Sequence, residues 1–262
     1  MSVYLLCSHI CDESTSIDLP QGVDTGFYAN DAIMGARSSI HKRSGTGTYD
    51  LVEFRGSNYP AGAPNLTADF LVQVRADLQF RNSVASSAAN IWRHTGAGWT
   101  NHSSATPTVN DLTGVKSQDY VRLFSSGTGT GWEYQQTYGS NTGGAHGAVY
   151  LGRQFSFNNP PTGPVVWEEF TEPSTANTMR GTRPFEVEAQ ITMTWAKVTA
   201  AKFTAFKALP KIYYWPFFVY DDQGDFIPWK LEHVILAGWT AQLVYVDTWD
   251  LTLNLLRLRH YP

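Results

Sequence analysis

The segment Pro184-Phe-Glu-Val-Glu-Ala-Gln-Ile-Thr-Met-Thr-Trp195 alternates strictly between apolar and polar residues. Its apolar positions are Phe185, Val187, Ala189, Ile191, Met193 and Trp195. A period of two is typical of a β-strand with one buried face. Because the polar face must meet solvent, the segment predicts an antiparallel sheet that is covered on one side only.

A short helix is predicted directly after this strand. Thr199 suits the N-cap position and Pro210 suits the end of the helix. The apolar face of this helix holds Phe203, Phe206 and Leu209. We expect about three turns, packed on the apolar face of the 184–195 strand. Further strands are predicted at residues 213–220, 231–237 and 248–258.

The first half of the chain has shorter strand patterns, separated by turns that contain Gly or Pro. Strands are predicted at residues 69–77, 90–94, 120–124, 132–136 and 148–152. The alternation in 69–77 predicts a half-buried strand, with 90–94 as its partner. The glycine-rich stretch from Ser125 to Gly131 predicts a flexible hairpin or surface loop. It lacks the Lys-Ser/Thr and the following helix that a phosphate-binding loop requires.

A change in amino-acid composition divides the chain into two predicted modules. Residues 158–164 read Asn-Asn-Pro-Pro-Thr-Gly-Pro, a composition typical of a rigid connection between domains. We therefore expect a β-sandwich or jelly-roll module over residues 1–152, of which the first 60 stay unassigned. A second β module with one short helix is expected over residues 153–262. The predicted fold class is all-β and mainly antiparallel.

The net charge and the hydropathy of the chain argue against nucleic acid as a partner and against a membrane-spanning helix. The formal net charge is −4, and no Lys/Arg cluster offsets it locally, which argues against nucleic acid as a partner. The apolar run from Ile212 to Tyr220 contains Pro216 and is shorter than the roughly 20 residues that a membrane helix needs. The apolar N-terminus has no basic residues before it, so we expect no signal peptide and synthesis in the cytoplasm.

The cysteine and histidine residues near the N-terminus are candidate zinc ligands by residue type. Cys7, His9 and Cys11 would share one face of a strand. Side chains two apart in a strand are roughly 6.5 Å from each other, too far for one tetrahedral zinc ion. The Asp221 segment also lacks the spacing of a calcium loop. We therefore expect no metal, no cofactor and no disulfide.

Catalytic patterns are also missing from the sequence. It has no G-x-S-x-G, no H-E-x-x-H and no protein-kinase signature. Two acidic groups could supply the carboxylate pair of a glycoside hydrolase. These groups are Glu168, Glu169 and Glu172, and Asp221, Asp222 and Asp225. We expect both groups to lie in solvated turns, and His233 to lie on a polar strand face rather than to be catalytic. We expect no enzymatic activity, with glycoside hydrolysis as the second alternative function.

The aromatic residues of the first module allow a carbohydrate-binding surface. Its candidate stacking residues are Trp92, Trp99, Trp132 and Tyr134, with Tyr138 beside them. Aromatic residues at strand positions are more often part of a core. For this reason a carbohydrate-binding module for attachment to a host surface is only the first alternative function and not the main one.

Several segments resemble known phage virion proteins. In the first module these are Asn90-Ile-Trp-Arg93, Asp119-Tyr-Val-Arg-Leu-Phe124 and Gly147-Ala-Val-Tyr-Leu-Gly152-Arg-Gln-Phe155. They resemble virion proteins that begin with a galactose-binding-like β-sandwich. The second module has a strand, a helix and three strands, ending in Trp249-Asp-Leu-Thr-Leu-Asn-Leu255. That order resembles the ring-forming domain of distal tail proteins, which join the tail tube to the tip.

The resemblance implies a structural subunit of a phage tail tip, made in the host cytoplasm and built into the virion. Its partners would be copies of itself in a ring, with a hexamer favoured over a trimer. The ring would also contact the tail tube, hub or fibre proteins and a host surface glycan. The resemblance transfers no ligand-binding residue to this chain.

Overall fold

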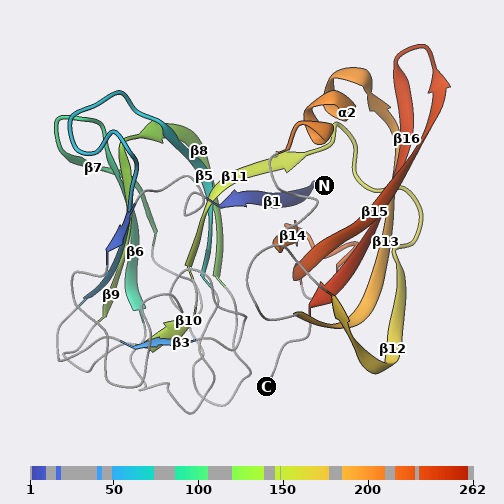
Figure 1. Cartoon of the computed structure of the whole chain (residues 1–262), viewed down its shortest axis with the longest axis horizontal. Coiled ribbons are helices and arrows are strands. Elements are labelled where there is room, and N and C mark those ends of the chain that lie inside the picture. The colour runs from blue at the N-terminus through green and yellow to red at the C-terminus, as the bar shows by residue number, and fades with distance from the viewer. Residues whose placement is uncertain are drawn as a thin grey trace. The chain divides into compact units, whose positions relative to one another are not determined.

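The computed structural model describes residues 2–9, 16–18, 40–42, 49–73, 86–105, 120–138, 145–147, 149–176, 185–209, 216–227 and 230–258 (Figure 1). These residues form antiparallel β-structure with one helix, which confirms the predicted fold class. The chain divides into two compact units. Unit 1 comprises Met1–Ser8 and Gln154–Arg259, and unit 2 comprises His9–Arg153 and His260–Pro262. The sequence-based division between residues 152 and 153 placed the first eight residues with the first module instead.

Unit 1 is an antiparallel sheet with a helix. Its strands are neighbours in the order β12, β13, β16, β15, β14, β1. Their bounds are Val166–Ala176 (β12), Phe185–Thr199 (β13), Thr248–Leu258 (β16), Leu231–Tyr245 (β15), Phe217–Asp221 (β14) and Val3–His9 (β1). β13, the helix α2 (Ala200–Lys207), β14, β15 and β16 follow one another along the chain in the predicted order. β16 has the predicted bounds, and β15 runs eight residues further than predicted.

The apolar face of β13 is buried as the alternation predicted. Ile191, Met193 and Trp195 lie in one core cluster with Phe203 and Phe206 of α2. Val187 belongs to a separate cluster with Ile235 and Leu258, so the prediction that it lies under the helix was wrong. The change of cluster follows from the length of the strand, since an eight-residue helix of about 12 Å cannot cover a fifteen-residue strand.

The helix begins as predicted and ends earlier. The Thr199 side chain accepts a hydrogen bond from the Lys202 N–H and caps the first turn. The helix ends at Lys207, which makes it two turns long rather than three. Leu209 follows the helix and still packs against the core of unit 1. Pro210, the predicted stop, lies outside the described residues.

The proline-rich segment expected to be a connection is tied to unit 1. Phe157 packs in the core against Trp195. The Asn158 side chain accepts from the Thr199 N–H and donates to the Lys197 carbonyl, both at 3.2 Å. The Thr162 N–H donates to the Thr194 carbonyl at 2.6 Å. No strand runs through residues 157–165, yet these bonds fix the segment along the end of β13.

Unit 2 is a β-sandwich. One sheet has the order β2, β4, β9, β6, β7, and β11, β5 and β8 are neighbours in the other. The bounds of the first are Ser16–Asp18 (β2), Tyr49–Arg55 (β4), Gly131–Tyr138 (β9), Ser86–His94 (β6) and Trp99–Ala105 (β7). Those of the second are Val149–Ser156 (β11), Leu66–Gln73 (β5) and Tyr120–Gly129 (β8), and a small pair joins β3 (Ile40–Lys42) to β10 (Ala145–Gly147).

Two aromatic side chains of β9 join the sheets of unit 2. The Trp132 indole N–H donates to the Leu66 carbonyl at 3.0 Å, and the Tyr134 hydroxyl donates to the Gln73 side chain at 2.8 Å. Both residues belong to the core cluster between the sheets. Each bond satisfies a buried polar group, and each ties the two sheets together.

Three expectations for unit 2 were wrong. β5 pairs with β11 and β8, whereas the predicted partner, 90–94, pairs with β7 and β9. β5 is buried on both faces at residues 70–73, so it is not half buried. The glycine-rich stretch is not a flexible loop, because β8 runs through Gly129 and β9 begins at Gly131. The chain changes sheets at Thr130, where a Cβ atom at Gly129 would meet backbone oxygens at 2.8 and 2.9 Å and one at Gly131 would crowd the rings of Tyr59 and Trp99.

Candidate functional site

The strongest candidate site lies on the outer face of the five-stranded sheet of unit 2. We use "outer face" for the side of β4, β9 and β6 opposite the core residues Phe54, Trp132 and Ile91. Strand register sets two rows across it, because paired residues of neighbouring strands share a face. One row is Arg55, Gly131, His94 and Trp99, and the other is Glu53, Glu133, Trp92 and Asn101.

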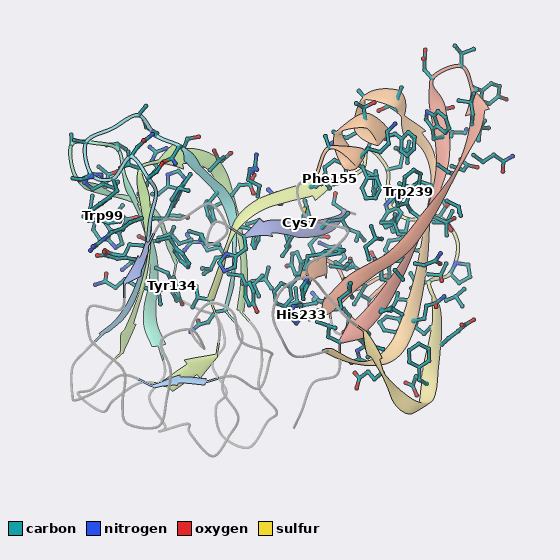
Figure 2. The ribbon with its side chains drawn as sticks, viewed as in Figure 1. Cys7, Trp99, Tyr134, Phe155, His233 and Trp239 are labelled. Carbon is teal, nitrogen blue, oxygen red and sulfur yellow. The ribbon has the colours of Figure 1, made fainter. Side chains whose placement is uncertain are left out.

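Three rings gather around Gly131 in the first row. The centroid of the His94 ring lies 4.9 Å from that of Tyr59 and 5.2 Å from that of Trp99. Tyr59 and Trp99 are 6.1 Å apart, and both are half buried, so part of each ring meets solvent. We call Tyr59, His94 and Trp99 the aromatic group. Figure 2 shows Trp99 on the outer side of the sheet and Tyr134 on the inner side.

The absence of a side chain at Gly131 lets these rings lie against the sheet. A Cβ atom there would be 3.1 Å from Cδ2 of Tyr59 and 3.3 Å from Cη2 of Trp99. Such contacts are tighter than most real Cβ contacts, so a larger residue would push the rings away. Glycine in a strand often marks this kind of close approach.

Hydrogen bonds hold the buried ring of the aromatic group in place. The Gly96 N–H donates to Nδ1 of His94 at 3.2 Å, and the Thr130 hydroxyl lies 2.9 Å from the same nitrogen. The Arg55 guanidinium lies over the Tyr59 ring, 5.0 Å from its centroid. These contacts hold His94 and Tyr59 in place, and the half-buried rings of Tyr59 and Trp99 keep part of their surface exposed.

Two carboxyl groups meet in the second row. Glu53 is buried and its Oε2 accepts from Nε of Arg55 at 2.9 Å. Glu133 lies opposite Glu53 and forms a hydrogen bond with it. Burial, the negative charge of Glu53 and that hydrogen bond raise the pKa of Glu133 to about 7. Near neutral pH the pair therefore shares one proton for much of the time.

The predicted stacking residues do not form one platform. Trp92 and Trp99 lie on the outer face and are half buried. Trp132 and Tyr134 are 0% and 1% exposed and lie in the core, so these two assignments are corrected. The physical reason is the strand period, since residues two apart on β9 share its inner face. The side chain of Tyr138 lies outside the described residues.

Sequence reasoning missed Tyr59 and Glu133. Glu133 stands between Trp132 and Tyr134, so alternation places it on the opposite face and could have identified it. Tyr59 follows β4 in an irregular segment with a cis bond to Pro60, and no sequence period predicts where it lies.

The acidic groups proposed for hydrolysis have other surroundings. Asp221 is 1% exposed rather than solvated as expected, and its carboxylate organises the turn by accepting from the N–H groups of Gln223, Phe226 and Ile227 at 3.3, 2.7 and 3.1 Å. Glu168 and Glu169 are exposed residues of β12, not of a loop as expected. Glu172 also falls in β12, with its side chain outside the described part.

His233, Cys7 and His9 have packing roles. His233 is buried and stacks on Phe218 at 4.4 Å, so its assignment to a polar strand face was wrong. Cys7 lies in the core of unit 1. Nδ1 of His9 lies 2.9 Å from the Leu151 carbonyl. Cys11 falls outside the described residues.

Two further findings concern metals and membranes. Among the residues that the structure describes, no three His, Cys, Asp or Glu side chains are grouped so that they could hold a metal ion. Within the same residues, no helix has the length and apolar character needed to cross a membrane.

Comparison with known proteins gives distant structural likenesses. No protein-family model and no curated protein matches the sequence. Three solved structures illustrate the structural matches, each with the TM-score and the share of each chain that is covered. For the two CBM32 domains and M60 catalytic domain of Clostridium perfringens ZmpB the TM-score is 0.41, with 9% identity over 57% of this chain and 15% of that one.

The other two are smaller proteins. A chitosan-binding module of a Paenibacillus sp. IK-5 chitosanase/glucanase has a TM-score of 0.38 and 13% identity, over 55% of this chain and 97% of that one. CBM32 of AlyQ, solved with 4,5-unsaturated mannuronic acid, has a TM-score of 0.37 and 16% identity, over 53% and 94%. The chain spans less than a sixth of the ZmpB structure. At these scores the likenesses carry no weight in assigning a ligand.

Proposed function

We propose that unit 2 binds a carbohydrate on its outer face and does not cleave it. The observation that carries this proposal is the aromatic group, in which the half-exposed rings of Tyr59 and Trp99 lie side by side over Gly131. Sugar rings present apolar C–H faces, which pack on aromatic rings held in this way. Trp92, in the next row, offers a third half-exposed ring.

Polar side chains lie near the aromatic rings of the outer face, on the same strands or on neighbouring ones. Asn101 and Ser104 are exposed and hydrogen-bond to each other, at 2.7 and 3.0 Å. Gln135 accepts from the Trp92 indole N–H at 3.3 Å and keeps its amide N–H groups for other partners. Planar amides and carboxylates can exchange such bonds for bonds to sugar hydroxyls. A ligand site needs this combination of apolar faces and fixed polar groups.

The carboxyl pair supports binding rather than hydrolysis. In glycoside hydrolases the two catalytic carboxyl groups are about 5 Å or more apart, with the scissile bond between them. Glu53 and Glu133 are directly opposite residues of neighbouring strands, and a hydrogen bond between them contributes to the raised pKa of Glu133, so they do not flank a space for a scissile bond. Arg55 also holds Glu53.

A glycan microarray probed with the labelled full-length protein tests this proposal. We expect binding to a restricted set of glycans, and competition by the free form of the best ligand. A protein that binds no glycan on arrays covering bacterial surface and plant polysaccharides would contradict the proposal.

We propose as a second function that unit 1 assembles the chain into a ring at a phage tail tip. One observation favours an assembly role, which is the apolar tip of the β15–β16 hairpin. Leu243, Val244, Tyr245 and Val246 are all exposed there, with Tyr245 at 71% and Val246 at 89%. Next to the tip, the Asp247 carbonyl accepts from the Ala200 N–H at 2.9 Å and ties the hairpin to the start of α2. Exposed apolar patches are typical of contacts between proteins.

Light scattering coupled to gel filtration tests the assembly role. We expect a hexamer or a trimer, because heterologous contacts that close give a ring. Tyr245→Lys should shift the mass toward the monomer, and Thr240→Lys on the same hairpin is the matched control. A wild-type protein that stays monomeric at high micromolar concentration would contradict ring formation through this tip.

A further inference from the structure

The second row of the outer face places a carboxylate beside an indole ring. Glu133 lies between Glu53 on β4 and Trp92 on β6. The Trp92 indole N–H donates to Gln135, two residues along β9 and on the same face as Glu133. This bond directs the Trp92 ring across the gap between β6 and β9, alongside Glu133. Side chains directly opposite in a sheet have Cβ atoms about 5 Å apart, so the ring and the carboxyl group are neighbours.

The negative charge at this position lacks a cation of its own. Arg55 forms its ion pair with Glu53. None of the cationic side chains that the structure describes forms an ion pair with Glu133.

An aromatic face next to a carboxylate is an arrangement that binds organic cations. The ring attracts the cation through its quadrupole, and the carboxylate accepts charge-assisted hydrogen bonds from it. Resting on the proposed function, we propose that the sugar bound on the outer face carries a positively charged amino group, which pairs with Glu133 beside Trp92. The neighbouring sugar faces would pack on Trp99 and Tyr59.

The protonation of the carboxyl pair agrees with this assignment. Burial, and after it the negative charge of Glu53, raise the pKa of Glu133 to about 7, and the second of these causes also favours a positively charged group beside the pair. In the free protein a proton supplies that charge near neutral pH. A ligand ammonium group would supply it in the complex, and the proton would be released to solvent.

Calorimetric titration with two matched oligosaccharides tests the inference. The probes are the β-1,4-linked tetramers of glucosamine and of N-acetylglucosamine, at pH 6.5. We expect the glucosamine tetramer to bind about tenfold more tightly, the scale of one half-buried charge contact. Raising the salt concentration from 50 to 500 mM should weaken only the binding of the glucosamine tetramer.

A conservative variant tests whether the preference for the glucosamine tetramer depends on Glu133. Glu133→Gln keeps the shape and the hydrogen bond to Glu53 and removes the charge. We expect it to lose the preference for glucosamine and to keep its affinity for the acetylated tetramer within about twofold. Glu168→Gln, at an exposed glutamate of unit 1, should behave as wild type.

The outcomes separate this inference from the proposed function. If both tetramers bind wild type equally, or the acetylated one binds more tightly, the inference is overturned and carbohydrate binding stands. The same holds if other glycans bind and neither tetramer does, or if Glu133→Gln keeps the preference. If no glycan binds at all, the proposed function and the inference fall together.

Discussion

The indole nitrogen of Trp132 donates a hydrogen bond to the backbone carbonyl of Leu66, 3.0 Å away and in the other sheet of unit 2. Both residues are fully buried. The bond spans 66 positions of the sequence and lies directly beneath the outer face, since Trp132 and Glu133 are neighbours on β9. Trp132 therefore ties the strand that carries Glu133 to the other sheet of unit 2.

Trp132→Phe should destabilise unit 2 by about 1 to 3 kcal/mol, because the buried Leu66 carbonyl loses its donor. The loss of ring volume adds a cavity term. Urea denaturation followed by circular dichroism would measure the change. Trp92→Phe, at a half-buried ring on the outer face, is the matched control and should cost less. Equal costs for both variants would contradict the structural role of Trp132.

Glu133 should make the stability of the protein depend on pH. Its pKa is raised from 4.5 to about 7 in the folded state, so its contribution to stability is full below pH 4.5 and is lost as the pH rises through 7. Glu133→Gln removes this dependence. Relative to wild type, the variant should gain about 1 to 2 kcal/mol between pH 5 and pH 8, after allowance for solvent screening. Unfolding free energies measured at both pH values check the sign, and a constant difference would contradict it.

Ile191→Ala should destabilise unit 1 by about 2 to 5 kcal/mol, because the side chain is buried in the main core cluster. Thr192→Ala, on the polar face of the same strand, should cost clearly less. Thermal unfolding of both variants measures the difference. A tolerant Ile191 would mean that the faces of β13 are inverted.

Gly129→Ala should disturb the corner between the sheets of unit 2. A Cβ atom there would lie 2.8 Å from the His94 carbonyl oxygen and 2.9 Å from that of Gly131. Both contacts are with backbone, so relief requires the strands to move, at about 1 to 3 kcal/mol. Gly238→Ala is the matched control, since nothing lies within 4 Å of its Cβ position. Proteolysis in native buffer should cleave the Gly129 variant faster, and equal rates would contradict the corner.

The sequence indicated unit 1 better than unit 2. The alternation of 184–195 and the pattern of 248–258 each reflect strands with one apolar face, so their period alone identifies them. β5 carries buried residues on both faces at 70–73, so its alternation is uninformative about burial. Its partners are set by sandwich packing, which local pattern does not record. The glycines on either side of Thr130 predict a loop from sequence, whereas in the structure they lie in strands and allow close packing.

The sequence alone identifies part of the candidate site. Trp92 and Trp99 were identified from their residue type, and both lie on the outer face. Trp132 and Tyr134 have the same residue types and lie in the core, so type alone does not separate surface rings from core rings. Tyr59 joins the site through an irregular segment after β4, and only tertiary structure brings it to Trp99.

The proposed binding of a carbohydrate on the outer face of unit 2 depends on the aromatic group. Calorimetric titration of Trp99→Ala with the best glycan ligand tests it most directly, with Tyr245→Ala as the control at an exposed ring of unit 1. Loss of one stacked ring should weaken binding about tenfold or more, while the control and the circular dichroism spectra stay unchanged. Wild-type affinity in the folded Trp99→Ala variant would contradict the claim.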